Sequence, residues 1–313
     1  MIKLYSNLND IKGKKEDYYT KITEKRKYIG KVNDLCKTYF DVEFKDIMLL
    51  DPEKLLKFVN DYNGCDRNRK NQIKRLFKQI PTHKGKKTNY IINILYDTMP
   101  DEAKKLIYDI AGTKTCPYCN RSFVDIVEEA DGKYQSVFQM DHFFSKDEYP
   151  MLAVSLFNLI PSCPNCNRIK GNKDFHYYPY DINSTAEDDL TFSFDYVSGM
   201  MTNDDDIKVL IKYNNANMKS DAQRLFLQEL YEHHKDIAIE IIQKARYQGE
   251  GYLSSLLTQL QGLFPNRSDV YRIIFGGYLN KEDWKRRPLS KFTYDIAKET
   301  LEAYGISMTI FDN

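Results

Sequence analysis

Two short cysteine motifs carry the clearest chemistry in this 313-residue sequence. Cys116 and Cys119 stand in CPYCNR, and Cys163 and Cys166 stand in CPNCNR. Two thiolates on one tight turn can grip a metal ion, and two such turns complete the tetrahedral four-cysteine site typical of zinc. A redox dithiol is the alternative for a lone CxxC, but these motifs match each other and no thioredoxin-like βαβ pattern surrounds them. The spacing therefore predicts a structural Zn²⁺ site.

A second group of polar residues lies in and just after the 43 residues between the motifs. Asp141 and His142 end a predicted strand, Asn158 precedes the second motif, and Asn167 follows it. Phosphodiester hydrolysis needs a base that is neutral at working pH, which suits histidine. It also needs a cation, and Asp and Asn oxygens are ligands that Mg²⁺ accepts. Neighbours on a regular strand point to opposite faces, so Asp141 and His142 share a site only if the strand ends or twists there.

The order of these elements resembles the HNH endonuclease family, the ββα-metal fold, in its zinc-stabilised four-cysteine form. The resemblance covers residues 113–175. It implies that His142 is the general base and that Asp141 and Asn167 hold one catalytic Mg²⁺ or Mn²⁺ ion. It also implies that Asn158 hydrogen-bonds backbone so that His142 stays oriented. The alternative is a catalytically silent zinc-ribbon module that binds nucleic acid or protein, although such a module needs only the cysteines.

Basic side chains flank both cysteine motifs. Beside a nuclease site, such residues are typical of contact with the phosphates of DNA. The alternative is that they only form a solvated surface. His176 is a second candidate for the last metal ligand, ranked below Asn167. The predicted nucleic-acid-binding residues are Arg121, Arg168, Lys170 and Lys173.

The N-terminal third reads as helical and basic. Asp51-Pro52 predicts a helix start with Asp51 as the N-cap, and Gly112 closes a helix that opens at Pro100. Residues 68–80 form a basic amphipathic helix, which we expect to add affinity for the nucleic-acid backbone. Residues 1–110 hold 24 Lys and Arg against 16 Asp and Glu, whereas the rest of the chain is acidic. This asymmetry allows one part of the chain to contact phosphates.

The remaining chain mixes short strands and helices. We expect strands at 122–128 and 133–144, a second hairpin near 190–213, and helices from 217 to 303. The predicted fold class is a mostly helical α+β protein with an embedded ββα-metal core and a structural zinc. Three regions follow: a basic helical region at 1–112, the nuclease core at 113–180, and a hairpin with helices at 181–313 that docks a partner.

Composition and flanks complete the prediction. No run of about 18 apolar residues is present and the N-terminus lacks an apolar signal core, so we expect a cytoplasmic protein without membrane contact. The sequence around Gly85 fails the Walker A spacing, so no ATPase site is expected in this chain. The layout is similar to the PtuB-type HNH proteins of Septu and retron-associated anti-phage systems. That likeness implies DNA as substrate and a separate PtuA-like ATPase that docks on the helical flanks.

Overall fold

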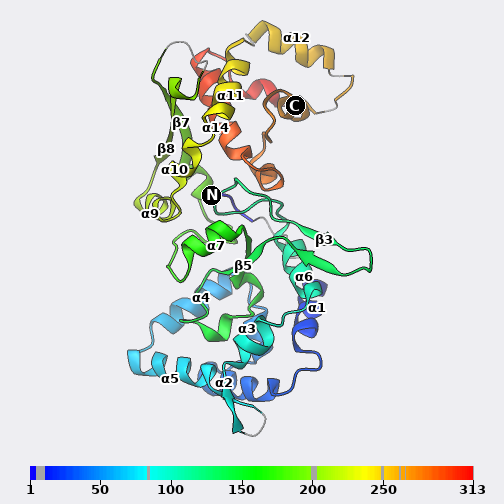
Figure 1. Ribbon diagram of the computed structural model, residues 1–313, viewed down its shortest axis with the longest axis vertical. Helices are drawn as coiled ribbons and strands as arrows, with labels where there is room; N and C mark the ends of the chain where they lie inside the picture. The colour runs from blue at the N-terminus through cyan, green and yellow to red at the C-terminus, as the bar shows by residue number, and fades with distance from the viewer. Residues whose placement is uncertain are drawn as a thin grey trace. The chain divides into compact units, whose positions relative to one another are not determined.

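The computed structural model describes residues 1–4, 11–82, 85–198, 203–247, 250–260, 262–264 and 266–312 (Figure 1). The chain divides into two compact units. The N-terminal unit comprises Leu4–Thr113 and Val124–Ile182, and the C-terminal unit comprises Met1–Lys3, Lys114–Phe123 and Asn183–Asn313. The predicted α+β class is confirmed, because helices dominate and the strands pair in small antiparallel sheets. The three functional regions drawn from the sequence stay a prediction.

Helices form most of the N-terminal unit. They are α1 (Lys12–Thr23), α2 (Ile29–Phe40), α3 (Phe44–Met48), α4 (Pro52–Asn63), α5 (Arg67–Lys78), the π-helix η3 (Ile91–Tyr96), α6 (Asp101–Ala111) and α7 (Pro164–Lys170). Two helix ends predicted from the sequence, the start at Asp51 and the end at Gly112, are confirmed. Gly112 ends α6 at a φ of 58°, a left-handed conformation that suits glycine. Asp51 precedes α4 but makes no side-chain cap, because its carboxylate pairs with Lys15 instead.

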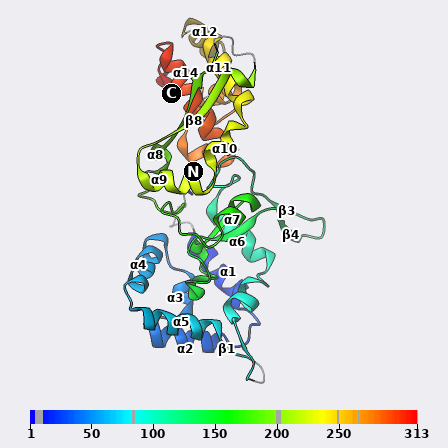
Figure 2. The ribbon, with the colours of Figure 1, turned by 60° about the vertical axis from the view of Figure 1, so that its left-hand side comes forward.

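The basic helix predicted at 68–80 is α5, one residue earlier at its start and two shorter at its end. The carboxylate of Asp66 caps it by accepting hydrogen bonds from the backbone N–H groups of Asn68 and Arg69. Ile73 and Phe77 are buried, as the apolar spacing predicts. Figure 2 shows α5 beside α2 in the N-terminal unit. The apolar stripe therefore holds the helix, and its basic residues lie on the remaining faces.

Short antiparallel pairs complete the N-terminal unit. They are β1 (Ile80–Pro81) with β2 (Lys87–Thr88), β3 (Ile126–Glu128) with β4 (Tyr134–Ser136), and β5 (Gln139–His142) with β6 (Leu159–Ser162). The single strand predicted at 133–144 is wrong, because the chain changes partner between Ser136 and Gln139. β4 pairs with β3, whereas β5 pairs with β6 across two 3-10 turns, η4 (Pro150–Leu152) and η5 (Leu156–Asn158).

The C-terminal unit packs helices on one hairpin. Its elements are α8 (Ala186–Asp189), β7 (Leu190–Tyr196), η6 (Asp204–Asp206), β8 (Ile207–Tyr213), α9 (Ala216–Arg224), α10 (Leu227–Glu232), α11 (Lys235–Tyr247), α12 (Glu250–Leu260), α13 (Arg267–Phe275), η7 (Lys281–Arg286), α14 (Ser290–Ala303) and η8 (Met308–Phe311). The hairpin predicted near 190–213 is confirmed in its described part, whereas residues 199–202 lie outside it. The helical stretch expected from 217 is interrupted at Phe226, whose φ of 54° cannot continue a right-handed helix.

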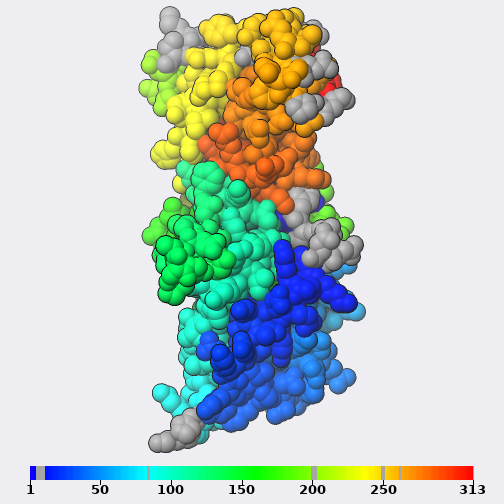
Figure 3. Space-filling model, turned by 90° about the vertical axis from the view of Figure 1, so that its right-hand side faces the viewer, coloured from blue at the N-terminus to red at the C-terminus, as the bar shows by residue number. Residues whose placement is uncertain are grey.

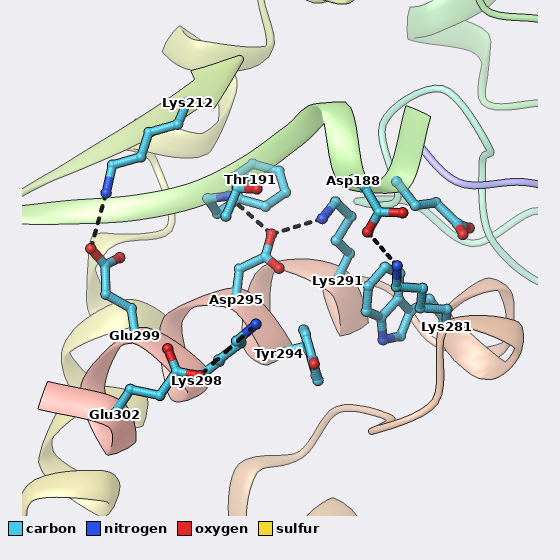
Figure 4. Close-up of a pocket in the computed structure, with 13 residues that line it drawn as sticks. Asp188, Thr191, Lys212, Lys281, Lys291, Tyr294, Asp295, Lys298, Glu299 and Glu302 are labelled. Carbon is cyan, nitrogen blue, oxygen red and sulfur yellow. Dashed lines mark hydrogen bonds and ion pairs between the residues drawn. The ribbon is translucent and has the colours of Figure 1, made fainter. Parts of the chain in front are cut away.

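A cavity of about 420 Å³ lies between this hairpin and α14 (Figure 4). Lys291 and Asp295, both buried, pair at 2.9 Å, and Asp295 also accepts a hydrogen bond from the backbone N–H of Phe192. Burial raises the pKa of Asp295 above its ordinary value. Lys212 and Lys281 likewise pair with carboxylates in the wall. The Lys212–Glu299 pair and the Asp295–Phe192 hydrogen bond tie α14 to the hairpin, and the ion pairs compensate charges of the lining.

Within the described part of the chain, no helix is both long and apolar enough to cross a bilayer.

Candidate metal centre and active site

The four motif cysteines come together. Their sulfur atoms all lie within 4.8 Å of one another and all four residues are buried. A tetrahedron of thiolates about 2.3 Å from a zinc ion has edges of about 3.8 Å, so the cluster fits zinc. Backbone N–H groups of Arg121 and Cys166 point at the sulfurs of Cys119 and Cys163, at 3.4 and 3.5 Å. Such contacts stabilise thiolates.

The first motif is held within the C-terminal unit by Asn120, which is 1% exposed. Its side chain donates to the hydroxyl of Thr115 at 3.1 Å and to the carbonyl of Trp284 at 3.0 Å, and it accepts from the N–H of Lys291 at 3.2 Å. Asn120 adopts a φ of 49°, the left-handed conformation that asparagine tolerates better than most residues. This asparagine is therefore a structural anchor of its turn.

The second motif starts helix α7. Cys163 is its N-cap and Pro164 its first residue, and the preceding strands β5 and β6 complete the order strand, strand, helix. The equivalent asparagine, Asn167, is half-buried and donates from Nδ2 to the side-chain oxygen of Gln139 at 2.7 Å. Its Oδ1 takes no part in that hydrogen bond. The two matching motifs thus place their asparagines in different surroundings.

Asp141 faces α7. Its carboxylate lies 3.1 Å from Nζ of Lys170, and the two side chains are 2% and 1% exposed. The same ammonium group contacts the backbone oxygens of His142 at 2.8 Å and Phe143 at 3.3 Å. The Asp141 carboxylate and the backbone carbonyls of His142 and Phe143 therefore all face the ammonium group of Lys170. Carboxylate and carbonyl oxygens are ligands that Mg²⁺ or Mn²⁺ prefers, and Asn167 lies on the same helix as Lys170.

His142 leaves the strand on another side. Its ring packs against Tyr96 with centroids 4.4 Å apart, and its Nε2 lies 2.9 Å from the carbonyl oxygen of Ala153. Since a carbonyl can only accept, Nε2 carries the proton and Nδ1 keeps its lone pair. Burial lowers the pKa of His142 to about 3, so the ring is neutral at physiological pH.

Asn158 organises the loop that holds His142. Its side chain is fully buried, accepts from the N–H of Phe144 at 2.8 Å, and donates to the carbonyls of Phe144 and Leu152, both at 3.0 Å. Leu152 precedes Ala153, whose carbonyl bonds His142. The hydrogen bonds of Asn158 therefore hold together the two ends of the connection between β5 and β6.

The predicted nucleic-acid-binding residues fall into different environments. Arg168 and Lys173 are exposed, whereas Lys170 is buried against Asp141. Arg121 donates from Nε to Nε2 of His234 at 2.9 Å and lies over the ring of Tyr231 in the C-terminal unit. Contact with DNA stays a prediction for these four residues.

Sequence reasoning missed three partners at this site. Gln139 could have been found, because it stands two residues before Asp141 and a strand places alternate residues on one face. The position of Tyr96 against His142 carries no sequence signal, since the two residues are far apart in the chain. The carbonyl of Ala153 is a backbone group, which no residue pattern reveals.

Comparison with known proteins agrees with this geometry. Residues 116–173 match the family model described as HNH endonuclease. The chain is 39% identical over 72 residues to the Septu protein PtuB of Bacillus thuringiensis, and the match spans 23% of this chain and 24% of that protein. No solved structure gives a significant match. The four-cysteine cluster, the strand–strand–helix order and these matches show that the chain carries an HNH domain at residues 116–173.

Proposed function

We propose that this protein is a metal-dependent endonuclease that hydrolyses phosphodiester bonds of DNA. The carrying observation is the imidazole of His142, which the Ala153 carbonyl orients and which directly follows Asp141 in the chain, where carboxylate and carbonyl oxygens gather at Lys170. A general base must offer a lone pair toward a water molecule, and Nδ1 is the ring nitrogen left for this task. Asn158 supports the role indirectly, because it closes the loop that carries the Ala153 carbonyl.

Asp141 and Asn167 would hold one Mg²⁺ or Mn²⁺ ion. A divalent ion bound there would stabilise the negative charge that develops on the phosphate and on the leaving oxygen. The ammonium of Lys170 now satisfies the carboxylate, so its side chain would turn away from Asp141 when an ion binds. Turned outward on α7, it would reach a phosphate of the substrate, as would the exposed Arg168 and Lys173.

The biological setting we propose is anti-phage defence in the cytoplasm. The relative's name assigns it to the Septu system, and the shared segment is the HNH domain. The chain spans about a quarter of that relative's length, so the partner is a separate proposal. We propose a PtuA-like ATPase that docks on the helical flanks and controls the nuclease.

Cleavage of plasmid DNA tests the nuclease directly. We expect cutting by the wild type with Mg²⁺ or Mn²⁺ and a loss of about 10²- to 10⁴-fold in His142→Ala, because the base is gone. About one zinc per chain should be present in both proteins, as a four-thiolate site requires. His176→Ala, which removes an exposed histidine close to the second motif, is the matched control and should cut like the wild type.

Equal cutting by wild type and His142→Ala would exclude His142 as the base. The alternative function, a silent zinc module, predicts no cutting by any variant even when a PtuA-like ATPase and ATP are added. Cutting by the wild type that appears only when the ATPase and ATP are added would instead support a nuclease that the ATPase regulates.

A further inference from the structure

We propose that a basic surface around the β1–β2 hairpin binds the phosphate backbone of a nucleic-acid strand, separately from the HNH residues. The proposal rests on the proposed function only in its choice of ligand. We call it the hairpin surface. Its residues are Lys25, Arg26, Lys27, Lys31, Arg75, Lys86 and Lys87.

The hairpin has a hollow on each side. One, of about 350 Å³, is lined by Lys25, Arg26, Lys27 and Lys86 and has no carboxylate among its described lining residues. The other, of about 540 Å³, is lined by basic side chains from α2, α5 and β2, with Asp34 as the single acidic group described there. Both hollows belong to the N-terminal unit, and Figure 3 shows the hairpin beside the N-terminal helices at the lower end.

In the described part of the chain, carboxylates compensate almost none of the charges of the hairpin surface. Among the described residues, no carboxylate forms an ion pair with Lys27, Lys31, Arg75, Lys86 or Lys87, and Lys25 reaches only the exposed Glu24 at 3.9 Å. Two other basic residues of α5 differ: Lys74 pairs with Glu148 at 2.9 Å and Lys78 with Asp147 at 3.5 Å. We therefore add the hairpin to the phosphate-contacting role expected of helix 68–80, because its cations have almost no carboxylate partner among the described residues to give up.

The turn that carries three of these cations is held in place. Lys25 and Tyr28 have φ values of 60° and 73°, a left-handed conformation that is strained for non-glycine residues and that clusters at functional sites. The hydroxyl of Tyr90 donates to the backbone carbonyl of Lys27, and Arg26 donates to the carbonyl of Thr98 at 2.9 Å. The neighbouring η3 helix thus fixes the turn before any ligand arrives.

The same short helix reaches the proposed base. Ile94 of η3 lines the first hollow, and Tyr96, two residues later, packs on the ring of His142. A π-helix is rare and often marks a functional site. A strand held on the hairpin surface would therefore lie on the element that also borders His142.

The spread of the cations favours a strand over a single anion. They come from the α1–α2 turn, α5 and the hairpin, and they line two hollows without converging on one point. A chain of regularly spaced phosphates matches this distribution, and each lysine contact releases a counterion from the nucleic acid.

Salt-dependent binding tests the proposal. All proteins carry His142→Ala, so that nothing is cut, and bind a labelled single strand of about 25 nucleotides and the matching duplex. The triple variant Lys27→Gln/Lys86→Gln/Lys87→Gln should lower the slope of log K against log salt by about 2 to 3 and weaken binding at least about tenfold. The control Lys37→Gln/Lys45→Gln/Lys104→Gln removes the same charge from ion-paired lysines of the same unit and should keep the slope.

Equal slopes in the two triple variants, or an unchanged slope in the first, would overturn the proposal. So would competition by inorganic phosphate as effective as by unlabelled strand, which would indicate a single-anion site. Thermal unfolding should be alike in all proteins, because the replaced hairpin lysines are exposed. A wild type that binds strands but does not cut them, even when a PtuA-like ATPase and ATP are added, would refute the nuclease and leave this surface standing.

Discussion

The Nζ atom of Lys170 lies 3.1 Å from the carboxylate of Asp141, and both side chains are almost completely buried. The lysine ends the helix that starts at the second cysteine motif, and the aspartate lies on the first strand of the ββα order. Each charge compensates the other at a site shielded from bulk water. Removing one partner leaves an uncompensated buried charge.

We therefore expect Lys170→Met to destabilise the fold by about 3–5 kcal/mol, because Asp141 is then left without its cation. Urea unfolding of the wild type and the variant measures the loss. Lys173→Met, three residues on and exposed, is the control and should change stability by less than about 0.5 kcal/mol. Equal stabilities of the wild type and Lys170→Met would show that this pair adds nothing to the fold.

The two motif asparagines should differ in how much the same change costs. Asn120→Ala removes three buried hydrogen bonds, to Thr115, Trp284 and Lys291, so we expect a loss of about 2–4 kcal/mol in unfolding free energy. Asn167→Ala removes one hydrogen bond at a half-exposed site and should cost about 1 kcal/mol or less. DNA cleavage should fall in Asn167→Ala, since it removes a proposed ion ligand. The reverse ranking of stability would contradict the assignment of Asn120 as the anchor.

Zinc content distinguishes the motif cysteines from the other buried thiol. Cys163→Ser should lose the zinc and unfold at lower urea, because three thiolates hold the ion less well and the site contributes folding energy. Cys36→Ser also replaces a buried cysteine but lies outside the cluster, and it should keep about one zinc per chain. Elemental analysis after gel filtration measures the zinc content of both variants. Full zinc in Cys163→Ser would refute the four-cysteine site.

His234 should make the C-terminal unit sensitive to acid. Partial burial, with the nearby Arg121, lowers the pKa of His234 below its ordinary value of 6.5. Its Nε2 accepts a hydrogen bond from Arg121 and must stay unprotonated. Below about pH 6.5 the unfolded chain therefore binds more protons than the folded one, and stability falls as the pH falls toward the lowered pKa.

Urea midpoints at about pH 7.5 and about pH 5.5 check this dependence. We expect a smaller drop in His234→Gln than in the wild type, because the titrating group is gone. His233→Gln, at the exposed neighbour, should drop as the wild type does. Identical drops in all three proteins would show that His234 is not coupled to folding.

Much of this protein follows from short stretches of its sequence. The CxxC pairs predict the zinc cluster because two thiolates on a turn are a local device. The apolar spacing of Ile73 and Phe77 predicts the buried face of α5, and Gly112 predicts the end of α6. The order Asp141-His142, Asn158, Asn167 predicts the HNH domain, which the family match confirms. Each of these signals is a short stretch of residues or a fixed order of short motifs.

Only the tertiary structure decided which role each of the two matching motifs has. CPYCNR and CPNCNR offer the same asparagine, yet Asn120 is buried against Trp284, which is 164 residues away, whereas Asn167 meets Gln139. The partner of Asp141, the ring against His142 and the uncompensated charges of the hairpin surface are decided in the same way. Burial and pairing depend on which distant segments meet. The local order of residues along the chain does not reveal which distant segments pack together.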